Sequence, residues 1–585
     1  MSEPDNLDIP QFDRRFLHPD AGFTQIGSGD LGGKASGLNL VRTKILSKIK
    51  SEEFPQIEVK VPTLAVLTTE LFDIFMEQND LYSLVKNDMP DDRIAHAFQK
   101  GSFPARFIGD LRALISEVHT PLAVRSSSRL EDALDHPFAG VYGTKMIPNN
   151  QPDIDTRFQR LVEAIKFVYA STFFRQAQNY LSSVGQERCS EKMAVIVQKI
   201  VGRRYADRFY PGISGVGRSY NYYPSGQSSP SDGVVNLALG LGKEIVDGGL
   251  SWTYSPASPQ APSPFNDIGD LLKNTQTRFW VVNMGRPPLP DPVRETEYLN
   301  HIDLSAAEMD NTLRFIASTF DGSSGRMRPG VGFSGPRVLD FAPILQYDSL
   351  PLNQLIKRLL EISEEALGAE VEIEFALNYD LNDGLPVQFG FLQVRPMVVS
   401  HQQIDIQPEE CIGDSVVLAT DRVLGNGLRD DILDIVFIKP DTFDAKYTRE
   451  IATEIETLNR QIVNAGGIYL LIGFGRWGSS DPWLGVPIEW GQISGSRVIV
   501  EATLPNMNPD LSQGSHFFHN LIGLQILYMS VPLHSQFKIN WDWLNEQPVA
   551  TETKFVKHVK LLWPLEIKVD GKNGRGVVNY HEKRS

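Results

Sequence analysis

The 585-residue chain exceeds the size of one compact core, so three or four cooperating units are expected. Its hydrophobic fraction of 41% and charged fraction of 22% are ordinary for globular proteins and exclude a largely disordered or fibrous chain. The formal net charge of −16 argues against broad binding to nucleic acid or to an anionic membrane, because both need a concentrated positive face.

The chain begins with the polar, acidic segment MSEPDNLDIPQFDRRF, where a secretory signal would be basic and then apolar. No stretch approaches the roughly 20 apolar residues needed to cross a bilayer. Cys189 and Cys411 are the two cysteines, which excludes a disulfide framework and gives no zinc-ligand spacing. We therefore expect a protein of the reducing cytoplasm that does not enter a membrane.

The first motif is GSGDLGGKASGL at 27–38, a glycine-rich loop that leads with Lys34 into a predicted helix. A P-loop needs a glycine five residues before the Gly-Lys pair and a Ser or Thr after it. Ser28 and Ala35 occupy those positions, so the P-loop interpretation fails. Backbone N–H groups at the helix start and one ammonium group could still bind phosphate. The alternative is a flexible loop with a solvated lysine.

The second motif is PLAVRSSSRLED at 121–132, where an apolar strand runs into Arg125 and three serines. A guanidinium supplies forked donors and the hydroxyls add neutral ones, a combination that suits a phosphate chain. The alternative is a helix N-cap serine beside a surface arginine. The small-residue loop FAGVYGTK follows and places a second cation, Lys145, at its end.

Regular structure continues through the next hundred residues. The segment FQRLVEAIKFVYASTFF at 158–174 carries an apolar stripe and predicts a helix, and AVIVQKI at 194–200 predicts a strand. Ser, Pro and Gly mark surface loops at 222–233 and 255–264. Between these loops, VVNLALGLG indicates a buried strand that ends in a turn.

Two strand signals lie at 371–394, VEIEFAL and QFGFLQV, and the turn formers NYDLNDGLP between them favour an antiparallel pair. Alternation places Glu372 and Glu374 on one face of the first strand. It likewise places Gln393 and Arg395 on one face of the second. Two such carboxylates could hold Mg²⁺ against a polyphosphate, and the arginine could neutralise phosphoryl oxygens. The alternative is a half-exposed hairpin with a cross-strand ion pair.

After about residue 400 the pattern changes to a separate mixed α/β unit. Apolar residues recur every three or four positions over 447–462 and predict an amphipathic helix. IYLLIGFG and SRVIVEATL predict strands, and FFHNLIGLQILYM at 517–529 predicts a buried helix. The loop at 473–487 contains Arg476 and Asp481 and either binds an acceptor or is a tightly packed turn.

His516 follows Gly514 and Ser515 and shares a predicted helix face with His519. The pattern could hold a phosphohistidine or contribute to a metal site, but two adjacent aromatic residues and the lack of a third ligand favour a structural helix.

In order and approximate spacing, these motifs resemble the ATP-binding half of the phosphoenolpyruvate synthase and pyruvate phosphate dikinase family over roughly the first 400 residues. GGKASGL is similar to the family's GGKGANL segment, and AVRSSSRLEDALDHPFAGVYGT is similar to VRSSATAEDLPDASFAGQ. The segments VPTLAVLTTELFDIF, KMAVIVQKIVG, LALGLGKEIVDGG, VEIEFAL and LQVRPM complete the series.

The resemblance implies an α/β (α+β) fold with a two-lobed ATP-grasp unit of antiparallel sheets and a smaller C-terminal mixed α/β domain. The lobes would be residues 1–205 and 206–400, and the domain of unknown role would be 401–585. ATP would lie between the lobes with Mg²⁺, and Lys34, Arg125 and Arg395 would be catalytic. The implied nucleotide-binding residues are Lys34, Arg125, Gln198 at the adenine, Glu374, Gln393 and Arg395, and the implied metal ligands are Glu372 and Glu374.

The sequence departs from the family pattern in four respects. The GLGE turn ends here in Lys243, so a usually acidic position is basic, although Glu244 follows directly. The SGVMFTRDP segment appears as SGVGRSYNYYP at 214–224. No T-S-H phosphohistidine motif is present, and the chain left after residue 400 is too short for a (β/α)₈ barrel.

We therefore predict a Mg-ATP-dependent phosphotransferase of the dikinase type. Its acceptor would be a small molecule, a histidine of a partner protein or a group in the C-terminal unit. The alternatives are a non-catalytic ATP-binding sensor or regulatory module and the ATP-binding subunit of a split synthase. A partner subunit or a homo-oligomer would be compatible with each of these functions.

Overall fold

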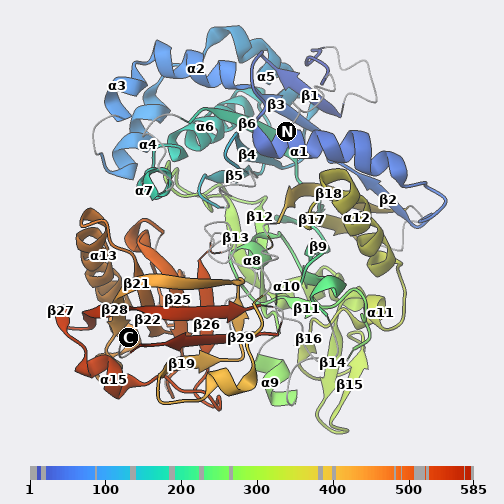
Figure 1. The fold of residues 1–585 in the computed structure, drawn as a ribbon. Coiled ribbons are helices and arrows are strands. Elements are labelled where there is room, and N and C mark those ends of the chain that lie inside the picture. The colour runs from blue at the N-terminus through green and yellow to red at the C-terminus, as the bar shows by residue number, and fades with distance from the viewer. Residues whose placement is uncertain are drawn as a thin grey trace.

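A computed structural model describes most of the chain. The described residues are 9–14, 22–85, 89–131, 140–183, 191–222, 229–261, 268–273, 275–379, 386–397, 399, 404–479, 483–488, 490–505, 507, 521, 526–571 and 573–581. In this part of the chain, helices pack on mixed and antiparallel sheets (Figure 1), so the predicted fold class is confirmed. Within the same residues, no helix combines the length and the apolar composition that crossing a bilayer requires.

The first lobe is built on a five-stranded sheet near the N-terminus. Its strands, in sheet order, are β1 (Phe23–Ile26), β3 (Leu64–Leu67), β6 (Met193–Lys199), β4 (Leu122–Ser128) and β5 (Thr144–Ile147). β1 and β3 pair in parallel, and the other neighbours are antiparallel. The helices of this lobe are α1 (Gly32–Leu40), α2 (Thr69–Gln78), α3 (Leu81–Val85), α4 (Asp91–Lys100), α5 (Ala105–Glu117), α6 (Ile154–Ser171) and α7 (Arg175–Ser183).

Strand β3 lies between β1 and β6 and is buried on both faces. Ala65 and Leu67 belong to the core under α2 and α6, whereas Leu64 and Val66 pack with Ala35 of α1. A strand covered on both faces carries a continuous apolar run instead of an alternating one. The same packing holds the start of α1 against the sheet, where the glycine-rich loop begins.

The second lobe is built on a six-stranded sheet. Its strands, in sheet order, are β11 (Trp252–Tyr254), β10 (Val234–Ala238), β9 (Ile213–Arg218), β17 (Val371–Asn378), β18 (Val387–Pro396) and β2 (Ile57–Lys60). The predicted antiparallel pairing of β17 with β18 is confirmed. β2 pairs in parallel with β18, so the chain enters the second lobe early and then returns to the first. The limits 1–205 and 206–400 stay a prediction, and residues 57–60 lie in the second lobe's sheet.

Smaller elements surround this sheet. The four-stranded sheet contains β13 (Leu299–Asp303), β12 (Arg278–Asn283), β8 (Arg208–Tyr210) and β7 (Arg203–Tyr205), and the three-stranded sheet contains β15 (Arg326–Pro329), β14 (Ser318–Asp321) and β16 (Arg337–Val338). The helices are α8 (Lys243–Val246), α9 (Ile268–Lys273), α10 (Leu304–Met309), α11 (Ala342–Leu345) and α12 (Leu352–Leu367).

The C-terminal domain contains a nine-stranded sheet, shown in orange and red in Figure 1. Along the sheet lie β19 (Val416–Thr420), β29 (Arg575–Asn579), β28 (Val556–Asp570), β21 (Gly427–Ile438), β22 (Tyr469–Phe474), β25 (Ser496–Ala502), β26 (Leu527–Val531) and β20 (Val423–Leu424), and β27 (Val549–Glu552) pairs with β28. The row from β21 to β26 is parallel, and α13 (Thr448–Asn464) connects β21 to β22. A short helix, α15 (Trp541–Glu546), also lies in this domain.

One predicted helix of this domain is wrong over its last three residues, 527–529. The helix expected over 517–529 ends in strand β26, whose five residues are all buried and pair in parallel with β25. The periodicity of apolar residues cannot distinguish a short buried strand from a buried helix. Here the segment forms a strand because it hydrogen-bonds to the edge of β25. The earlier part of that segment lies largely outside the described residues.

The C-terminal domain packs directly on the first lobe. Helix α7 contacts the short helix η8 (Trp490–Ile493), and apolar residues of both units form one continuous core cluster. A Cβ added to Gly491 would lie 2.3 Å from the Cβ atom of Asn179, so this contact requires a glycine. The described part of the domain is therefore fixed against the helices of the first lobe.

Candidate functional site

A cavity of about 300 Å³ lies between the sheets of the two lobes. Six of the seven predicted site residues line it together: Lys34, Arg125, Gln198, Glu374, Gln393 and Arg395. Among the described residues, its lining comes from positions between Lys34 and Arg395. Separated segments of the first 400 residues thus meet in one place, as the motif series predicted.

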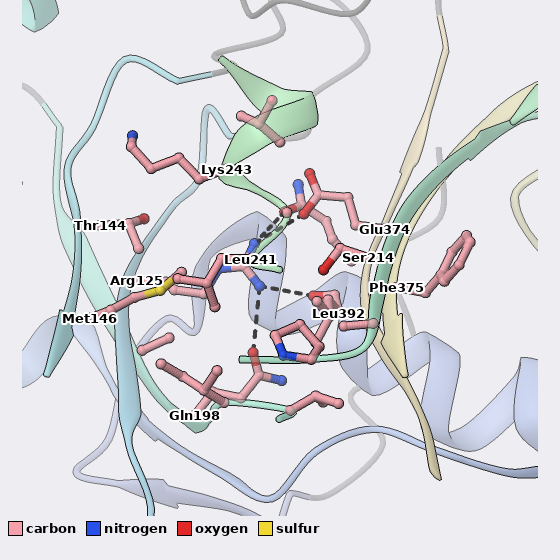
Figure 2. A pocket seen from close by; sticks show the side chains of 18 of the residues that line it. Arg125, Thr144, Met146, Gln198, Ser214, Leu241, Lys243, Glu374, Phe375 and Leu392 are labelled. Atoms are coloured by element: carbon pink, nitrogen blue, oxygen red, sulfur yellow. Dashed lines mark hydrogen bonds and ion pairs between the residues drawn. The ribbon is translucent and has the colours of Figure 1, made fainter. Parts of the chain in front are cut away.

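Arg125 joins the two lobes across this cavity (Figure 2). Its guanidinium extends from β4 and donates hydrogen bonds to Gln393 Oε1 at 2.7 Å and to the Leu392 carbonyl at 2.9 Å. Glu374 Oε2 lies 3.6 Å from the same guanidinium. The β17–β18 register shifts between Glu374 and Phe375, which leaves Leu392 as the extra residue of a β-bulge. Bulges redirect groups beside functional sites, and this one turns a carbonyl toward Arg125.

Lys34 lies near the start of α1 and is held by acidic and hydroxyl groups of the first lobe. Its Nζ atom donates to Glu131 Oε1 at 2.7 Å and to Ser126 Oγ at 3.3 Å. The Lys34 side chain is 13% exposed and that of Glu131 is 1% exposed, so the alternative of a solvated lysine is excluded. The pairing fixes an ammonium group at the edge of the cavity.

The glycines and serines of these two motifs have a packing role. A Cβ on Gly32 would lie 1.8 Å from the Ser127 carbonyl oxygen, and one on Gly33 would lie 1.9 Å from the carbonyl oxygen of Glu131. Ser127 Oγ donates to the Leu31 carbonyl and accepts from the Ala35 N–H. The glycine-rich loop therefore lets α1 begin in backbone contact with the end of β4. This contact places Lys34 beside Arg125.

The two predicted metal ligands have different surroundings. Glu374 is 23% exposed and lines the cavity. Glu372 is 2% exposed and lies outside the lining, where Arg218 Nε donates to its Oε2 atom at 2.6 Å and Arg395 Nε donates to its Oε1 atom at 2.8 Å. Direct Mg²⁺ binding by Glu372 stays a prediction.

Gln198 is the predicted adenine residue, and its amide group is incompletely satisfied. It lies on β6 and is 2% exposed, with Oε1 at 3.5 Å from a guanidinium nitrogen of Arg125. Its Nε2 atom is buried and has no hydrogen-bond partner among the described residues. An unsatisfied buried donor costs about 1–3 kcal/mol, and an acceptor on a ligand would remove that cost.

Lys243 also lines the cavity and is the first residue of α8 (Figure 2). The chain turns at Gly240, where φ is +85° and a Cβ would lie 2.7 Å from the Trp280 carbonyl oxygen. Lys243 Nζ then lies 3.0 Å from Asp247 and 3.4 Å from Glu295. Burial acts to lower the pKa of Lys243, but these two carboxylates outweigh it and raise the pKa. The basic replacement in the GLGE turn is therefore compensated locally.

Glu244 is directed away from the cavity. Its Oε2 atom lies 3.2 Å from His301 Nε2, and the imidazole stacks on Trp280. Burial raises the pKa of the Glu244 carboxyl to about 7, and the charge of Asp247 adds to this effect. Burial likewise lowers the pKa of His301. Glu244 thus pairs with the partly buried His301 and takes no part in the cavity lining.

Sequence reasoning missed Arg218. It lies on β9 directly opposite Glu372 of β17, two positions before the arginine of the family segment. Alternation along β9 puts it on the same face as Ser214 and Val216, which line the cavity. A charged residue at the end of an otherwise buried strand was the available signal.

The C-terminal candidates do not meet this site in the described part of the chain. Asp481, His516 and His519 lie outside the described residues, and so does Cys189. Arg476 begins the short strand β23 (Arg476–Trp477) and lies outside the cavity lining. Within the described ranges, no group of three or more His, Cys, Asp or Glu side chains is arranged to hold a metal by itself.

The loop around Arg476 is tightly packed at its beginning. The Trp477 backbone N–H donates to Glu501 Oε1 at 2.8 Å, and its indole N–H donates to the Val500 carbonyl at 3.2 Å. A Cβ on Gly473 would lie 2.2 Å from the Trp477 ring. These contacts make residues 473–477 a packed turn, and acceptor binding by the rest of the loop stays a prediction.

Comparison with known proteins gives two findings. The family model described as pyruvate phosphate dikinase, AMP/ATP-binding domain, matches residues 28–411. A phosphoenolpyruvate synthase of Aeropyrum pernix is 25% identical over 240 residues, which are 37% of this chain and 25% of that enzyme. The chain therefore aligns with only a quarter of that relative's length, and the cavity lies within the span of the family model.

Proposed function

Because the chain belongs to the family of the pyruvate phosphate dikinase AMP/ATP-binding domain, we propose that its cavity holds Mg-ATP and that it is a dikinase-type phosphotransferase with an unidentified acceptor. One observation carries the proposal. Lys34 and Arg125 from the first lobe reach the same cavity as Glu374 and Arg395 from the second, with Arg125 in contact with both lobes.

The polyphosphate would lie at the end of the cavity where Lys34, Arg125 and Arg395 converge. Forked guanidinium donors match phosphoryl oxygens, and the ammonium group adds a compact charge. The adenine would lie on the side of the cavity lined by Gln198, whose buried Nε2 atom lacks an acceptor. The flanking residues 199–201 also line the cavity there.

The residues around Glu374 fit a Mg²⁺ ion that is held partly by the nucleotide. Mg²⁺ commonly takes one or two protein carboxylates and completes its shell with phosphate oxygens and water. Glu374 opens into the cavity, and the absence of a three-residue ligand group in the described ranges is compatible with that mode. Bound there, the ion would supply charge neutralisation at the phosphates.

The chain's own contribution to transfer would be positioning and electrostatic stabilisation. Phosphoryl transfer requires little covalent chemistry from the protein, so most of the rate enhancement would come from cationic side chains that are already held in position before the reaction begins. Lys34, Arg125 and Arg395 are each held by a protein acceptor, which limits their reorganisation. The described lining contains no histidine, so the acceptor would be a small molecule, a partner's histidine or a group from outside this lining.

The second candidate is a non-catalytic ATP-binding sensor, or the ATP-binding subunit of a split synthase. Lys243 favours it, because the cavity lining carries a lysine at a position where the family pattern has an acidic residue. Both candidates require ATP binding. They differ in whether ATP turns over, and a split synthase would copurify with further subunits.

Calorimetric titration with ATP and an assay of Mg²⁺-dependent ATP turnover or ATP/AMP exchange test the proposal. Glu374→Gln should abolish most turnover while the protein stays folded, because it removes the carboxylate that opens into the cavity. The matched control is Glu361→Gln, an exposed carboxylate on α12, which should behave as the wild type. Binding without turnover would favour the sensor, and failure to bind ATP would refute both candidates.

A further inference from the structure

A continuous row of polar side chains crosses five strands of the second lobe's sheet and ends at the cavity. From the far edge, Asn236 of β10 donates to Thr253 of β11 at 2.7 Å. Arg218 of β9 donates to Asn236 at 3.2 Å and to Glu372 of β17 at 2.6 Å. Arg395 of β18 completes the row at 2.8 Å from Glu372. Strand register aligns its last three members, because Glu372 faces Arg218 on one side and Arg395 on the other.

Both oxygens of the Glu372 carboxylate take part in this row. Oε2 accepts from Arg218, and Oε1 accepts from the Nε and Nη2 atoms of Arg395, at 2.8 and 2.5 Å. All three side chains are strongly buried, at 6%, 2% and 11% exposure for Arg218, Glu372 and Arg395. A buried carboxylate between two guanidinium groups is costly to disturb, since its removal leaves two like charges in a poorly solvated place.

The members of the row differ in their access to the cavity. Arg395 lines it, whereas Arg218 and Glu372 lie outside the lining. Glu374, two residues further on β17 and on the same face, does open into it. Strand β17 thus carries one carboxylate that is accessible from the cavity, Glu374, and one that is buried and paired with two arginines, Glu372.

From this arrangement we infer that Glu372 and Arg218 are positioning residues, which orient the Arg395 guanidinium toward the phosphates, and that Glu374 supplies the metal-binding carboxylate without Glu372. The inference rests on the proposed function, because it assigns roles within the same nucleotide site. It also gives the buried Arg218 a function that the family pattern does not assign to this position of the sequence.

The test measures ATP binding by calorimetry in EDTA and over a range of free Mg²⁺ concentrations. A positioning role and a metal-ligand role predict different effects of Glu372→Gln on the ATP affinity measured in EDTA. If Glu372 orients Arg395, Glu372→Gln should weaken metal-free ATP binding about tenfold, the effect of one charge-assisted hydrogen bond. If Glu372 is a metal ligand, the same change removes a negative charge near the phosphates and should leave metal-free binding unchanged or strengthen it.

The Mg²⁺ series and further variants make the result specific. Glu372→Gln and Arg218→Met should leave the half-saturating Mg²⁺ concentration within about twofold of the wild type, whereas Glu374→Gln should raise it about tenfold or more. Arg218→Lys should recover part of the affinity that Arg218→Met loses. The double variant Glu372→Gln/Arg218→Met should lose no more than the larger single loss, because both residues act through Arg395.

Thermal unfolding of each variant identifies losses that come from misfolding, and the comparison uses variants whose unfolding stays cooperative. Arg218→Lys provides the measurement if Glu372→Gln does not fold. A shift of the Mg²⁺ requirement by Glu372→Gln equal to that of Glu374→Gln would overturn the inference and leave the proposed function intact. No ATP binding by the wild-type chain would overturn both.

Discussion

Replacement of Arg125 by lysine separates the charge of this residue from its geometry. The guanidinium reaches Gln393 Oε1 at 2.7 Å and the Leu392 carbonyl at 2.9 Å, two acceptors that belong to the other lobe. A lysine keeps the positive charge but lacks the planar fork that serves both acceptors and a phosphate. Losing one hydrogen bond from a charged donor costs about 1.5–3 kcal/mol.

That range corresponds to ATP binding weaker by roughly 10- to 150-fold, since about 1.4 kcal/mol equals a factor of ten. Calorimetric titration of Arg125→Lys with Mg-ATP measures the change. Arg93→Lys, at an exposed arginine of α4 outside the cavity lining, is the matched control and should bind like the wild type. Affinity of Arg125→Lys within about twofold of the wild type would refute the view that the fork of Arg125 organises the site.

Three further results are expected. Gln198→Leu should leave the free energy of unfolding unchanged or raise it by about 1 kcal/mol in thermal melts, because the buried Nε2 donor that lacks a partner is removed and the contact of Oε1 with Arg125 is long, at 3.5 Å. Calorimetry should find weaker ATP binding. Gly33→Ala should destabilise the chain by at least about 1–3 kcal/mol in denaturant titration, since its Cβ would meet the Glu131 carbonyl at 1.9 Å, and Gly322→Ala, with no atom within 4 Å, should be nearly neutral. The Glu244 carboxyl has a folded-state pKa raised from 4.5 to about 7, so its stabilising effect is complete below pH 4.5 and is lost as the pH rises to about 7. Glu244→Gln should therefore gain stability relative to the wild type by about 3 kcal/mol between pH 4.5 and 8, and a constant difference in urea titrations would contradict this.

The sequence was informative where a property depends on neighbouring residues. Alternation along VEIEFAL correctly placed Glu372 and Glu374 on one face, and the turn formers after it correctly indicated an antiparallel partner. The motif series identified six of the residues that line the cavity, because each motif is a short segment that can be recognised in the linear sequence. Their individual roles stay predictions until binding is measured.

The sequence was misleading where a segment's partner lies far away in the chain. The run LYMSV became strand β26 because β25 offered it an open edge, although its apolar residues suited a buried helix equally well. Strand β2 joined the sheet of the second lobe beside β18, which no local pattern indicated. The glycines at 32 and 33 suggested phosphate contact, and their observed role is the approach of α1 to β4.

What the sequence alone determined is which side chains share a face and which segments belong to the family unit, because periodicity and turn chemistry act over a few residues. Only the tertiary structure decided that Glu372 stands between Arg218 and Arg395 while Glu374 opens into the cavity. That difference arises from the register of three strands that are distant in the chain, and register is fixed by the packing of the whole sheet.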